Sequence, residues 1–394
     1  MKWTSEQQNV IDFRNRNILV SAAAGSGKTA VLVERIIKLI TDKEHPVDID
    51  NLLVLTFTNA AAAEMRERIG NAIDKALEEY PDDENLRKQQ TLLHNAQITT
   101  IDSFCLFVVR NHFEEIHLEP NFRIADQGEL KLLEIDVLNN IFEKEYKKQT
   151  QSFLHLVDAY SDKRSNKAVK EMVTKIYHQS ASNPWPKEWM ASLTKPYLVE
   201  NEAELLETEL MQGVFAYVKN MVSEMPSRLE SLREIALSED GPIKYTETLE
   251  VDLQGFEGLE EVDSFEKLDA FCKKAEASFG KLTALRNYTG SIEKKEAVSE
   301  GRNAIKKELK ELRARYFAMS LDELVEQLSR MRPIAEELVR LSLLYTEAME
   351  EKKAKLHIMD FSDIEHAALR IFVDEKTKEY RATAMDLKSS LPRL

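Results

Sequence analysis

The stretch Val20-Ser-Ala-Ala-Ala-Gly-Ser-Gly-Lys-Thr29 stands between a short apolar run at residues 17–21 and apolar positions that recur at helical spacing over residues 30–40. The first run has the composition of a buried strand, and the second pattern indicates an amphipathic helix. Gly25 and Gly27 allow a tight turn whose backbone N–H groups point inward, and the positive end of the helix dipole faces the same space. A strand, a loop of small residues and a helix in this order predict a phosphate-binding loop.

The side chains around this loop suit a nucleoside triphosphate. Lys28 is expected to reach the β- and γ-phosphates, and the Thr29 hydroxyl is expected to bind Mg²⁺. The strict motif has glycine at its first position, whereas this chain has Ala22, and a glycine-rich turn that binds no nucleotide is the alternative. A helix is predicted over residues 3–11, where Gln7 is either a surface residue or a carboxamide that reads the adenine edge.

The composition bounds the class of protein. The chain has 394 residues and a formal net charge of −15, which fits about two or three globular domains and argues against a broad basic surface that coats nucleic acid. Net charge does not exclude a local cleft that contacts a strand. Cys105 and Cys272 have no metal or disulfide spacing, and the sequence contains neither a signal peptide nor a membrane span. A cytoplasmic location without membrane contact is therefore expected.

Two more strand patterns follow the loop, at residues 51–57 and 97–101, and each runs into a helical pattern. Strands that alternate with helices predict a parallel α/β sheet. Ligands of such sheets bind outside the carboxyl ends of the strands. Residues 56–59 and 100–104 are therefore expected on the same rim as Lys28.

From about residue 126 the character of the sequence changes. Residues 126–345 contain helical patterns rich in Glu, Lys and Leu, with breaks at residues 183–186, 240–242 and 255–258. No fixed-period repeat is evident, which argues against a solenoid. An all-helical insertion of ordinary domain size is predicted.

Acidic residues near the end of the chain raise the question of a metal site. Asp360 and Asp363 lie at the start of an amphipathic pattern and form a possible metal pair. Helix capping is the preferred interpretation, because Ser362 and Glu365 have the spacing of a capping box and aspartate favours a helix start.

Together these segments resemble the UvrD-type superfamily 1 helicases. Gln7 matches their glutamine motif, and residues 22–29 match their phosphate loop, including the alanine at its first position. Residues 55–69 resemble the motif that contacts the tracked single strand. Residues 100–105 resemble the next motif, with Asp102 where many relatives have histidine.

The resemblance implies an α/β fold, with an incomplete RecA-like P-loop core around a parallel sheet and a large all-helical inserted subdomain. Residues 360–363 resemble the segment where the family's chain returns to this core. The implied domains are the first part of the ATPase core at 1–125, the helical insertion at 126–345, the return segment at 346–381 and a tail outside the family pattern at 382–394.

Less specific segments resemble one branch of this family, the AddA-type helicase–nuclease subunits, and the resemblance covers about residues 1–381. They lie in residues 122–126, 156–160, 183–189 and 281–286. This resemblance implies a role in processing DNA double-strand breaks, together with an AddB-like partner subunit.

Such a subunit should continue into an apolar strand ending in Asp-Glu-Tyr-Gln-Asp, a second motor domain with arginine fingers and a nuclease domain. After Arg381 the sequence departs from the family, as a truncated or frame-shifted product would. Asp374 and Glu375 are the nearest mimic of the acidic motif. They continue the preceding helical pattern and are predicted to be a solvated helix end.

The resemblance predicts the N-terminal, ATP-binding and DNA-contacting part of an ATP-dependent DNA helicase/nuclease subunit, with ATP and Mg²⁺ as cofactors and DNA as a partner. The chain alone is expected to be inactive. The alternatives are a non-hydrolysing nucleotide-binding or assembly module and an unrelated P-loop kinase or ATPase. The expected ATP-binding residues are Gln7, Ala22, Ala23, Ala24, Gly25, Ser26, Gly27, Lys28 and Thr29, with Lys28 and Thr29 catalytic and Thr29 the metal ligand. The expected DNA-binding residues are Thr56, Phe57, Thr58, Asn59, Ser103 and Phe104, of which Phe104 is equally well explained as a core aromatic.

Overall fold

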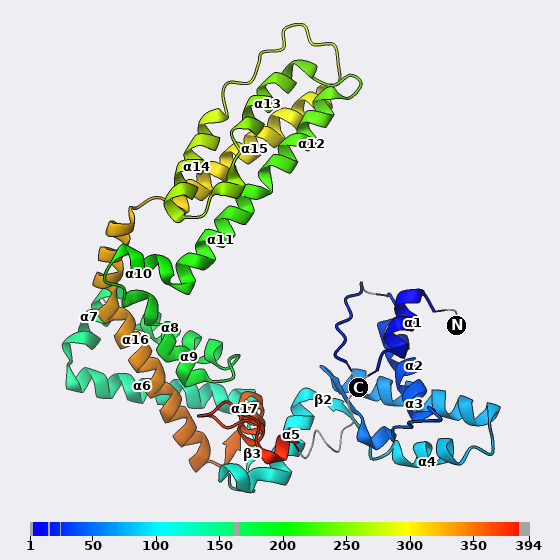
Figure 1. The fold of residues 1–394 in the computed structure, drawn as a ribbon. Helices are drawn as coiled ribbons and strands as arrows, with labels where there is room; N and C mark the ends of the chain where they lie inside the picture. The colour runs from blue at the N-terminus through cyan, green and yellow to red at the C-terminus, as the bar shows by residue number, and fades with distance from the viewer. Residues whose placement is uncertain (1–2, 15, 24, 161–164, 386–394) are drawn as a thin grey trace. The chain divides into compact units, whose positions relative to one another are not determined.

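In the computed structural model the chain is mostly helical (Figure 1). The described residues are 3–14, 16–23, 25–160 and 165–385. They fall into two compact units, of which the first comprises residues 1–148, 170–189 and 342–394 and the second residues 149–169 and 190–341. No helix in the described part of the chain is both long and apolar enough to cross a bilayer.

The N-terminal part of the first unit is an α/β arrangement. Its main elements are α1 (Ser5–Asp12), α2 (Lys28–Ile40), β1 (Leu53–Thr56), α3 (Asn59–Glu79), α4 (Glu84–Leu92), β2 (Gln97–Thr100) and α5 (Ile101–His112). Strands β1 and β2 pair in parallel, from Leu53 opposite Gln97 to Thr56 opposite Thr100. Apolar residues of α2 and α3, including Ile36 and Ile69, pack with Val54 and Ile98 of the strands in one buried cluster. The strands predicted at residues 51–57 and 97–101, and their parallel pairing, are confirmed.

The strand predicted at residues 17–21 is wrong as a description of this structure. These residues have no regular secondary structure, and Leu19 is 98% exposed. An apolar strand is stable when neighbouring strands satisfy its N–H and C=O groups on both sides. In the described part of the chain β1 and β2 pair only with each other, so residues 17–21 have no ladder to join. The parallel sheet is therefore small, and the complete RecA-like core stays a prediction.

The remainder of the first unit surrounds a second small parallel sheet. Its main elements are β3 (Arg123–Ile124), α6 (Gln127–Lys148), most of α8 (Lys167–Ser180), the C-terminal part of α16 (Leu321–Lys355), β4 (Ile358–Met359) and α17 (Phe361–Phe372). Strand β4 lies beside β3, with Ile358 opposite Arg123. Helix α17 packs along α5 through a cluster that includes Val108, Val109, Ile364 and Ile371.

The compact units do not follow the change of composition at residue 126, because α6 and most of α8 belong to the first unit. The domain boundaries at 125, 345 and 381 remain predictions. Residues 386–394, most of the predicted tail, lie outside the described residues.

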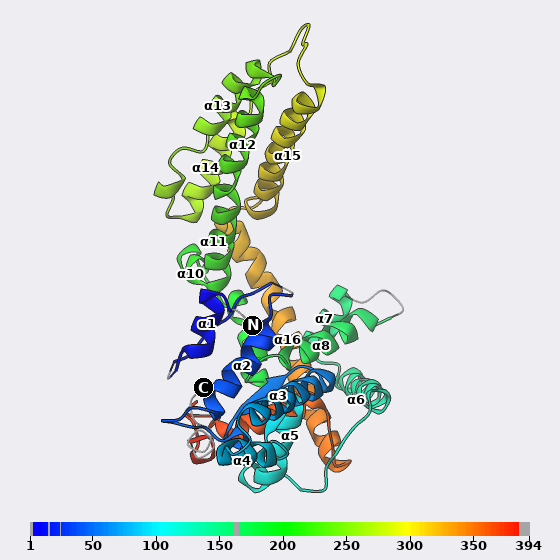
Figure 2. The same ribbon diagram turned by 90° about the vertical axis from the view of Figure 1, so that its right-hand side faces the viewer.

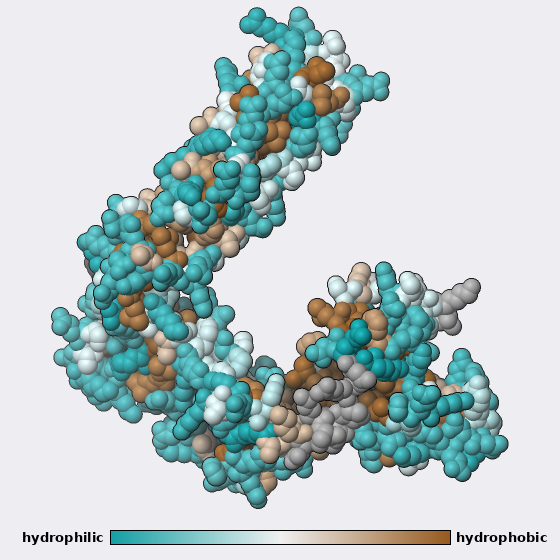
Figure 3. Space-filling view, in the orientation of Figure 1, coloured by the Kyte–Doolittle hydropathy of each residue, from teal (hydrophilic) through white to brown (hydrophobic). Residues whose placement is uncertain are grey.

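The named elements of the second unit are helices, joined by short irregular segments. It contains α7 (Gln151–Tyr160), α10 (Glu202–Glu207), α11 (Glu209–Ser223), α12 (Met225–Leu237), α13 (Thr246–Gln254), α14 (Phe265–Ser278) and α15 (Ile292–Tyr316). Helices α12, α13, α14 and α15 run side by side (Figure 1 and Figure 2) around a core that includes Leu229, Leu268 and Leu309. Polar residues cover most of the face of these helices that Figure 3 shows, as expected for amphipathic helices. A buried ion pair joins Arg302 to Asp252, with Nη2 2.9 Å from Oδ1.

Candidate nucleotide- and DNA-binding site

The loop before α2 has the backbone that a phosphate-binding loop needs. Gly25 and Gly27 adopt φ values of +78° and +81°, in the left-handed region that residues with a Cβ rarely adopt. Gly27 is the N-cap residue of α2 and has no side chain to satisfy the first N–H groups of that helix. These groups are therefore free to bind an anion. Ala24, which was predicted in the same site, lies outside the described residues.

Lys28 and Thr29 form the first turn of α2, and both are exposed. The Lys28 ammonium folds back over the loop and donates to the carbonyl oxygens of Ala22 and of Ala23, the latter at 2.9 Å. The lysine therefore lies on the loop itself, within reach of any anion that the loop binds. The Thr29 hydroxyl follows directly on the same turn.

Gln7 is brought to this loop from α1. Its Oε1 accepts from the Thr4 backbone at 3.0 Å in a capping box, and its Nε2 donates to the carbonyl oxygen of Ser26 at 3.2 Å. Helix α1 is fixed on α2 by Arg35, which is 6% exposed and donates to the carbonyl oxygens of Val10 and Phe13. The structure thus places Gln7 beside the loop.

A second group of predicted residues meets at the carboxyl ends of β1 and β2. Thr56 and Thr100 are register partners. Thr58 caps α3 by accepting from Ala61 at 3.1 Å, and Thr100 caps α5 by accepting from Ser103 at 3.2 Å. We call residues 56–59 and 100–104 the rim. The two rim segments lie together, as the strand pattern predicts, whereas their position on the same rim as Lys28 stays a prediction.

The rim residues differ in how far their side chains are exposed to solvent. Phe57 is 90% exposed and Asn59 and Ser103 are also exposed, so they are free to contact a ligand. Phe104 is half-buried and stacks on Phe372 of α17, with ring centroids 6.4 Å apart. The packing favours the core interpretation of Phe104, and its role in DNA binding stays a prediction.

The thiol of Cys105, next to the rim, has low reactivity. Burial, followed by the nearby Glu365 and Asp102, raises the pKa of Cys105 to about 11. The thiol is therefore neutral near pH 7 and a poor nucleophile.

The fit to Mg²⁺ is partial. Thr29 supplies one hydroxyl at the start of α2, and no group of three His, Cys, Asp or Glu residues in the described ranges is arranged to hold a metal. The acidic candidates have structural partners. Asp374 lies beyond the end of α17, in a turn where its Oδ1 accepts from the Lys376 and Thr377 backbones at 2.9 and 3.0 Å. Its pKa is lowered by these backbone hydrogen bonds. The prediction that Asp374 and Glu375 continue the helix is therefore wrong, because α17 ends at Phe372 and Asp374 closes the turn beyond it.

Asp360 and Asp363 are confirmed as a helix cap, although the predicted residues of the box are wrong. Asp360 Oδ1 accepts from the Asp363 backbone and Asp363 Oδ2 accepts from the Asp360 backbone, each at 2.8 Å. Ser362 and Glu365 do not form the box, because Asp360 is the N-cap residue and Ser362 already lies within the first turn. Ser362 instead lies near His366, whose Nδ1 is 2.8 Å from the Ser362 carbonyl oxygen.

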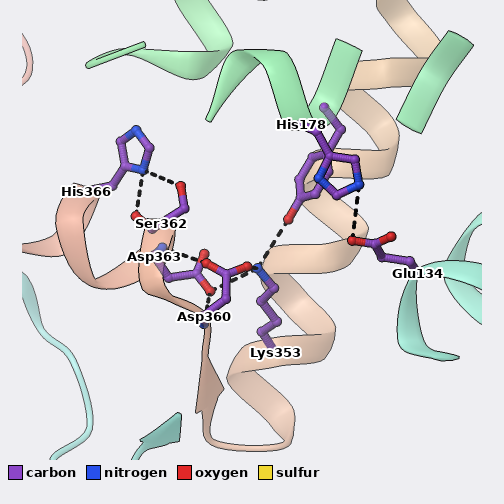
Figure 4. Close-up of polar contacts among 8 residues, drawn as sticks. Glu134, His178, Lys353, Asp360, Ser362, Asp363 and His366 are labelled. Atoms are coloured by element: carbon purple, nitrogen blue, oxygen red, sulfur yellow. Dashed lines mark hydrogen bonds and ion pairs between the residues drawn. The ribbon is translucent and has the colours of Figure 1, made fainter. Parts of the chain in front are cut away.

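A buried lysine beneath this cap was missed from the sequence. Lys353 of α16 is 4% exposed and donates to Asp360 Oδ2 at 2.6 Å and to Asp363 Oδ2 at 2.9 Å (Figure 4). Burial opposes the charged form, but Asp363, Tyr177 and Asp360 outweigh it and raise the pKa of Lys353. The spacing of seven residues between Lys353 and Asp360 is the one sequence feature that indicates this contact. The sequence does not show that the lysine is buried.

Comparison with known proteins places the chain. The family model of the UvrD/REP helicase N-terminal domain matches residues 3–385. An ATP-dependent helicase/nuclease subunit of Lachnoclostridium phytofermentans is 43% identical over 383 residues, which are 96% of this chain and 27% of that protein. Proteins of the same name from Clostridium perfringens and Clostridium botulinum are 40% and 37% identical, each over 95% of this chain and 30% of their own length. The chain therefore spans about a third or less of these relatives. The chain therefore belongs to the UvrD/REP helicase family, whose N-terminal domain it matches over residues 3–385.

Proposed function

We propose that the chain is the ATP-binding and DNA-contacting part of an AddA-type, ATP-dependent DNA helicase/nuclease that acts in double-strand break repair and recombination. The observation that carries the proposal is the loop at residues 22–29, whose left-handed glycines lead into α2 with Lys28 folded over them. The relatives are named as subunits of an ATP-dependent helicase/nuclease, which supports the same assignment. An AddB-like subunit is the proposed protein partner.

In this proposal Lys28 exchanges its two carbonyl acceptors for phosphate oxygens, and the N–H groups at the start of α2 bind the same phosphates. Thr29 would hold Mg²⁺, which neutralises phosphate charge when it is bound. Gln7 uses one lone pair and one N–H in its contacts with Thr4 and Ser26. A carboxamide has a further acceptor and donor, and these would read the adenine edge.

The rim is the proposed DNA contact. Hydroxyl and amide groups of Thr56, Thr58, Asn59 and Ser103 suit phosphate oxygens, which accept most protein–DNA hydrogen bonds. The exposed ring of Phe57 suits stacking on an unpaired base. Helices α2 and α3, which begin at the loop and at the rim, pack against each other, and this packing would connect nucleotide binding to DNA binding.

Replacement of Phe57 by alanine tests the DNA contact. Stacking on an aromatic ring contributes about 1–3 kcal/mol per base, so we expect Phe57→Ala to weaken binding of a fluorescent oligothymidylate by about fivefold or more in an anisotropy titration. Tyr80, which is 64% exposed at the far end of α3, supplies the control. Tyr80→Ala should bind like the wild type, and equal affinity of Phe57→Ala and wild type would refute the stacking role.

One observation favours a second function, a non-hydrolysing nucleotide-binding or assembly module. Hydrolysis in this class needs a carboxylate near the Thr29 hydroxyl to complete the Mg²⁺ site. Asp360 and Asp363 are held by Lys353, and Asp374 closes a turn. We therefore infer that the chain by itself binds nucleotide without turnover.

A further inference from the structure

The ammonium of Lys353 has three acceptors around it. Besides the carboxylates of Asp360 and Asp363, the hydroxyl of Tyr177 lies 3.2 Å from its Nζ. An ammonium group has three N–H donors, so these contacts match its full capacity. Tyr177 belongs to α8 and packs edge-on against Tyr345 of α16, with ring centroids 5.1 Å apart. The lysine thus joins helices α8, α16 and α17 at one point.

The two carboxylates that Lys353 contacts are the same ones that cap α17. Asp360 accepts from the cap through Oδ1 and from the lysine through Oδ2, whereas Asp363 accepts from both through Oδ2. The first turn of α17 is therefore oriented by a side chain that arrives from the end of α16 (Figure 4). Burying an ion pair costs desolvation and often adds little net stability, whereas it fixes the geometry of the groups that it joins.

Helix α17 transmits this geometry to the rim. Beyond the cap, Glu365 lies beside Asp102 in the first turn of α5; burial, and then Asp102, raises its pKa. Farther along, Phe372 stacks on Phe104 of the same turn of α5. The first turn of α5, which also contains Ser103, is thus packed against α17 at two places.

We propose that Lys353 is a positioning residue for the DNA contact: by holding both aspartates of the α17 cap, it sets α17 against α5 and thereby places Ser103 and Phe104 at the rim. This inference rests on the proposed function, because only a DNA-binding rim gives that placement a consequence. Lys353 itself does not touch the rim, so its effect is expected on DNA affinity and not on nucleotide affinity.

The experiment compares variants of the whole chain for binding of ATP and of a fluorescent oligothymidylate. Lys353→Met should weaken DNA binding by about tenfold, as displaced contact residues do, and leave ATP affinity within about twofold of the wild type, because the loop is a separate site. Lys187→Met is the control. It removes an exposed lysine that pairs with Glu350 of α16 and should change neither affinity.

A second variant separates position from stability. Lys353→Met combined with Asp360→Asn and Asp363→Asn removes the unpaired, half-buried charges and keeps an asparagine N-cap, which caps about as well as aspartate. We expect this triple variant to regain most of the melting temperature lost by Lys353→Met and to remain weak for DNA. It also carries the test if Lys353→Met does not fold.

Hydrogen exchange supplies the structural readout. Amides in the first turns of α17 and α5 should exchange faster in both variants, while those in the first turn of α3 should not change. Recovery of DNA affinity together with stability in the triple variant would overturn the positioning role, as would unchanged exchange in α5. Failure of the wild-type chain to bind the oligonucleotide would instead refute the proposed function, and this inference with it.

Discussion

Replacement of Lys28 by alanine removes a side chain that folds over residues 22–29, the proposed phosphate-binding loop. Its Nζ donates to the carbonyl oxygens of Ala22 and Ala23. When a triphosphate binds, the ammonium is expected to exchange these acceptors for phosphate oxygens. The alanine variant keeps the loop backbone and the helix N-terminus and loses only this charge.

The magnitude follows from the contacts that are exchanged. A hydrogen bond to a charged group contributes about 1.5–3 kcal/mol. The two carbonyl contacts that Lys28 gives up offset part of this gain, and its exposure allows solvent screening. We therefore expect the low end, about 1.5 kcal/mol, which corresponds to an ATP Kd about tenfold weaker. The effect should shrink as salt is added, because screening weakens exposed charges.

Isothermal titration of ATP into the wild type, Lys28→Ala and Lys43→Ala measures this difference. Lys43 is an exposed lysine beyond the end of α2, so Lys43→Ala makes the same change of charge away from the loop. We expect it to bind like the wild type. Equal ATP affinity of Lys28→Ala and the wild type would refute the assignment of the loop, and an equal loss in Lys43→Ala would attribute the effect to net charge.

Three further variants probe the backbone, the core and the pH dependence. Gly27→Ala should lower the free energy of unfolding by about 1–2 kcal/mol, because alanine is strained at the left-handed φ of this position. An added Cβ would meet only Gln7 Nε2, at 3.7 Å, so no clash adds to this cost. Unchanged unfolding in urea would contradict the prediction. Arg302→Met leaves the Asp252 carboxylate buried without its partner and should cost about 3–5 kcal/mol in the same assay, whereas a loss below about 1 kcal/mol would show that the pair is not buried. The hydrogen bond to Glu134 raises the pKa of His178 above its ordinary 6.5, so the contact stabilises fully below that value and fades as the pH rises through the raised pKa. His178→Gln should therefore lower the melting temperature at about pH 5.5 and much less at about pH 8.5, and an equal loss at both would exclude the ionised contact.

The parts of the fold that the sequence predicts well depend on neighbours in the chain. The glycines of the loop and the helix that follows them are local features, because backbone conformation and capping act within about four residues. The aspartate cap of α17 was predicted for the same reason. The box was assigned to Ser362 and Glu365 instead of Asp360 and Asp363, because a shift of two residues in the helix start changes which side chains form the box.

The parts that were missed depend on distant segments. Residues 17–21 have the composition of a strand, but a strand forms only where a neighbouring ladder exists. The break at residues 183–186 looks like an exposed loop, yet His366 Nε2 lies 2.8 Å from the Asn183 carbonyl oxygen and Lys378 lies over the Trp185 ring at 3.6 Å. The burial of Lys353 likewise requires Tyr177, 176 residues away. Periodicity and spacing do not contain such contacts.

Phosphate release is the most direct test of the central claim, that the chain binds ATP at residues 22–29 and does not hydrolyse it by itself. The purified chain is incubated with Mg²⁺, ATP and excess single-stranded DNA, beside Lys28→Ala. Because Asp360, Asp363 and Asp374 serve structural contacts, we expect both proteins to release phosphate at the same background rate with and without DNA. DNA-stimulated turnover that disappears in Lys28→Ala would contradict the claim and return Asp374 and Glu375 to consideration as metal ligands.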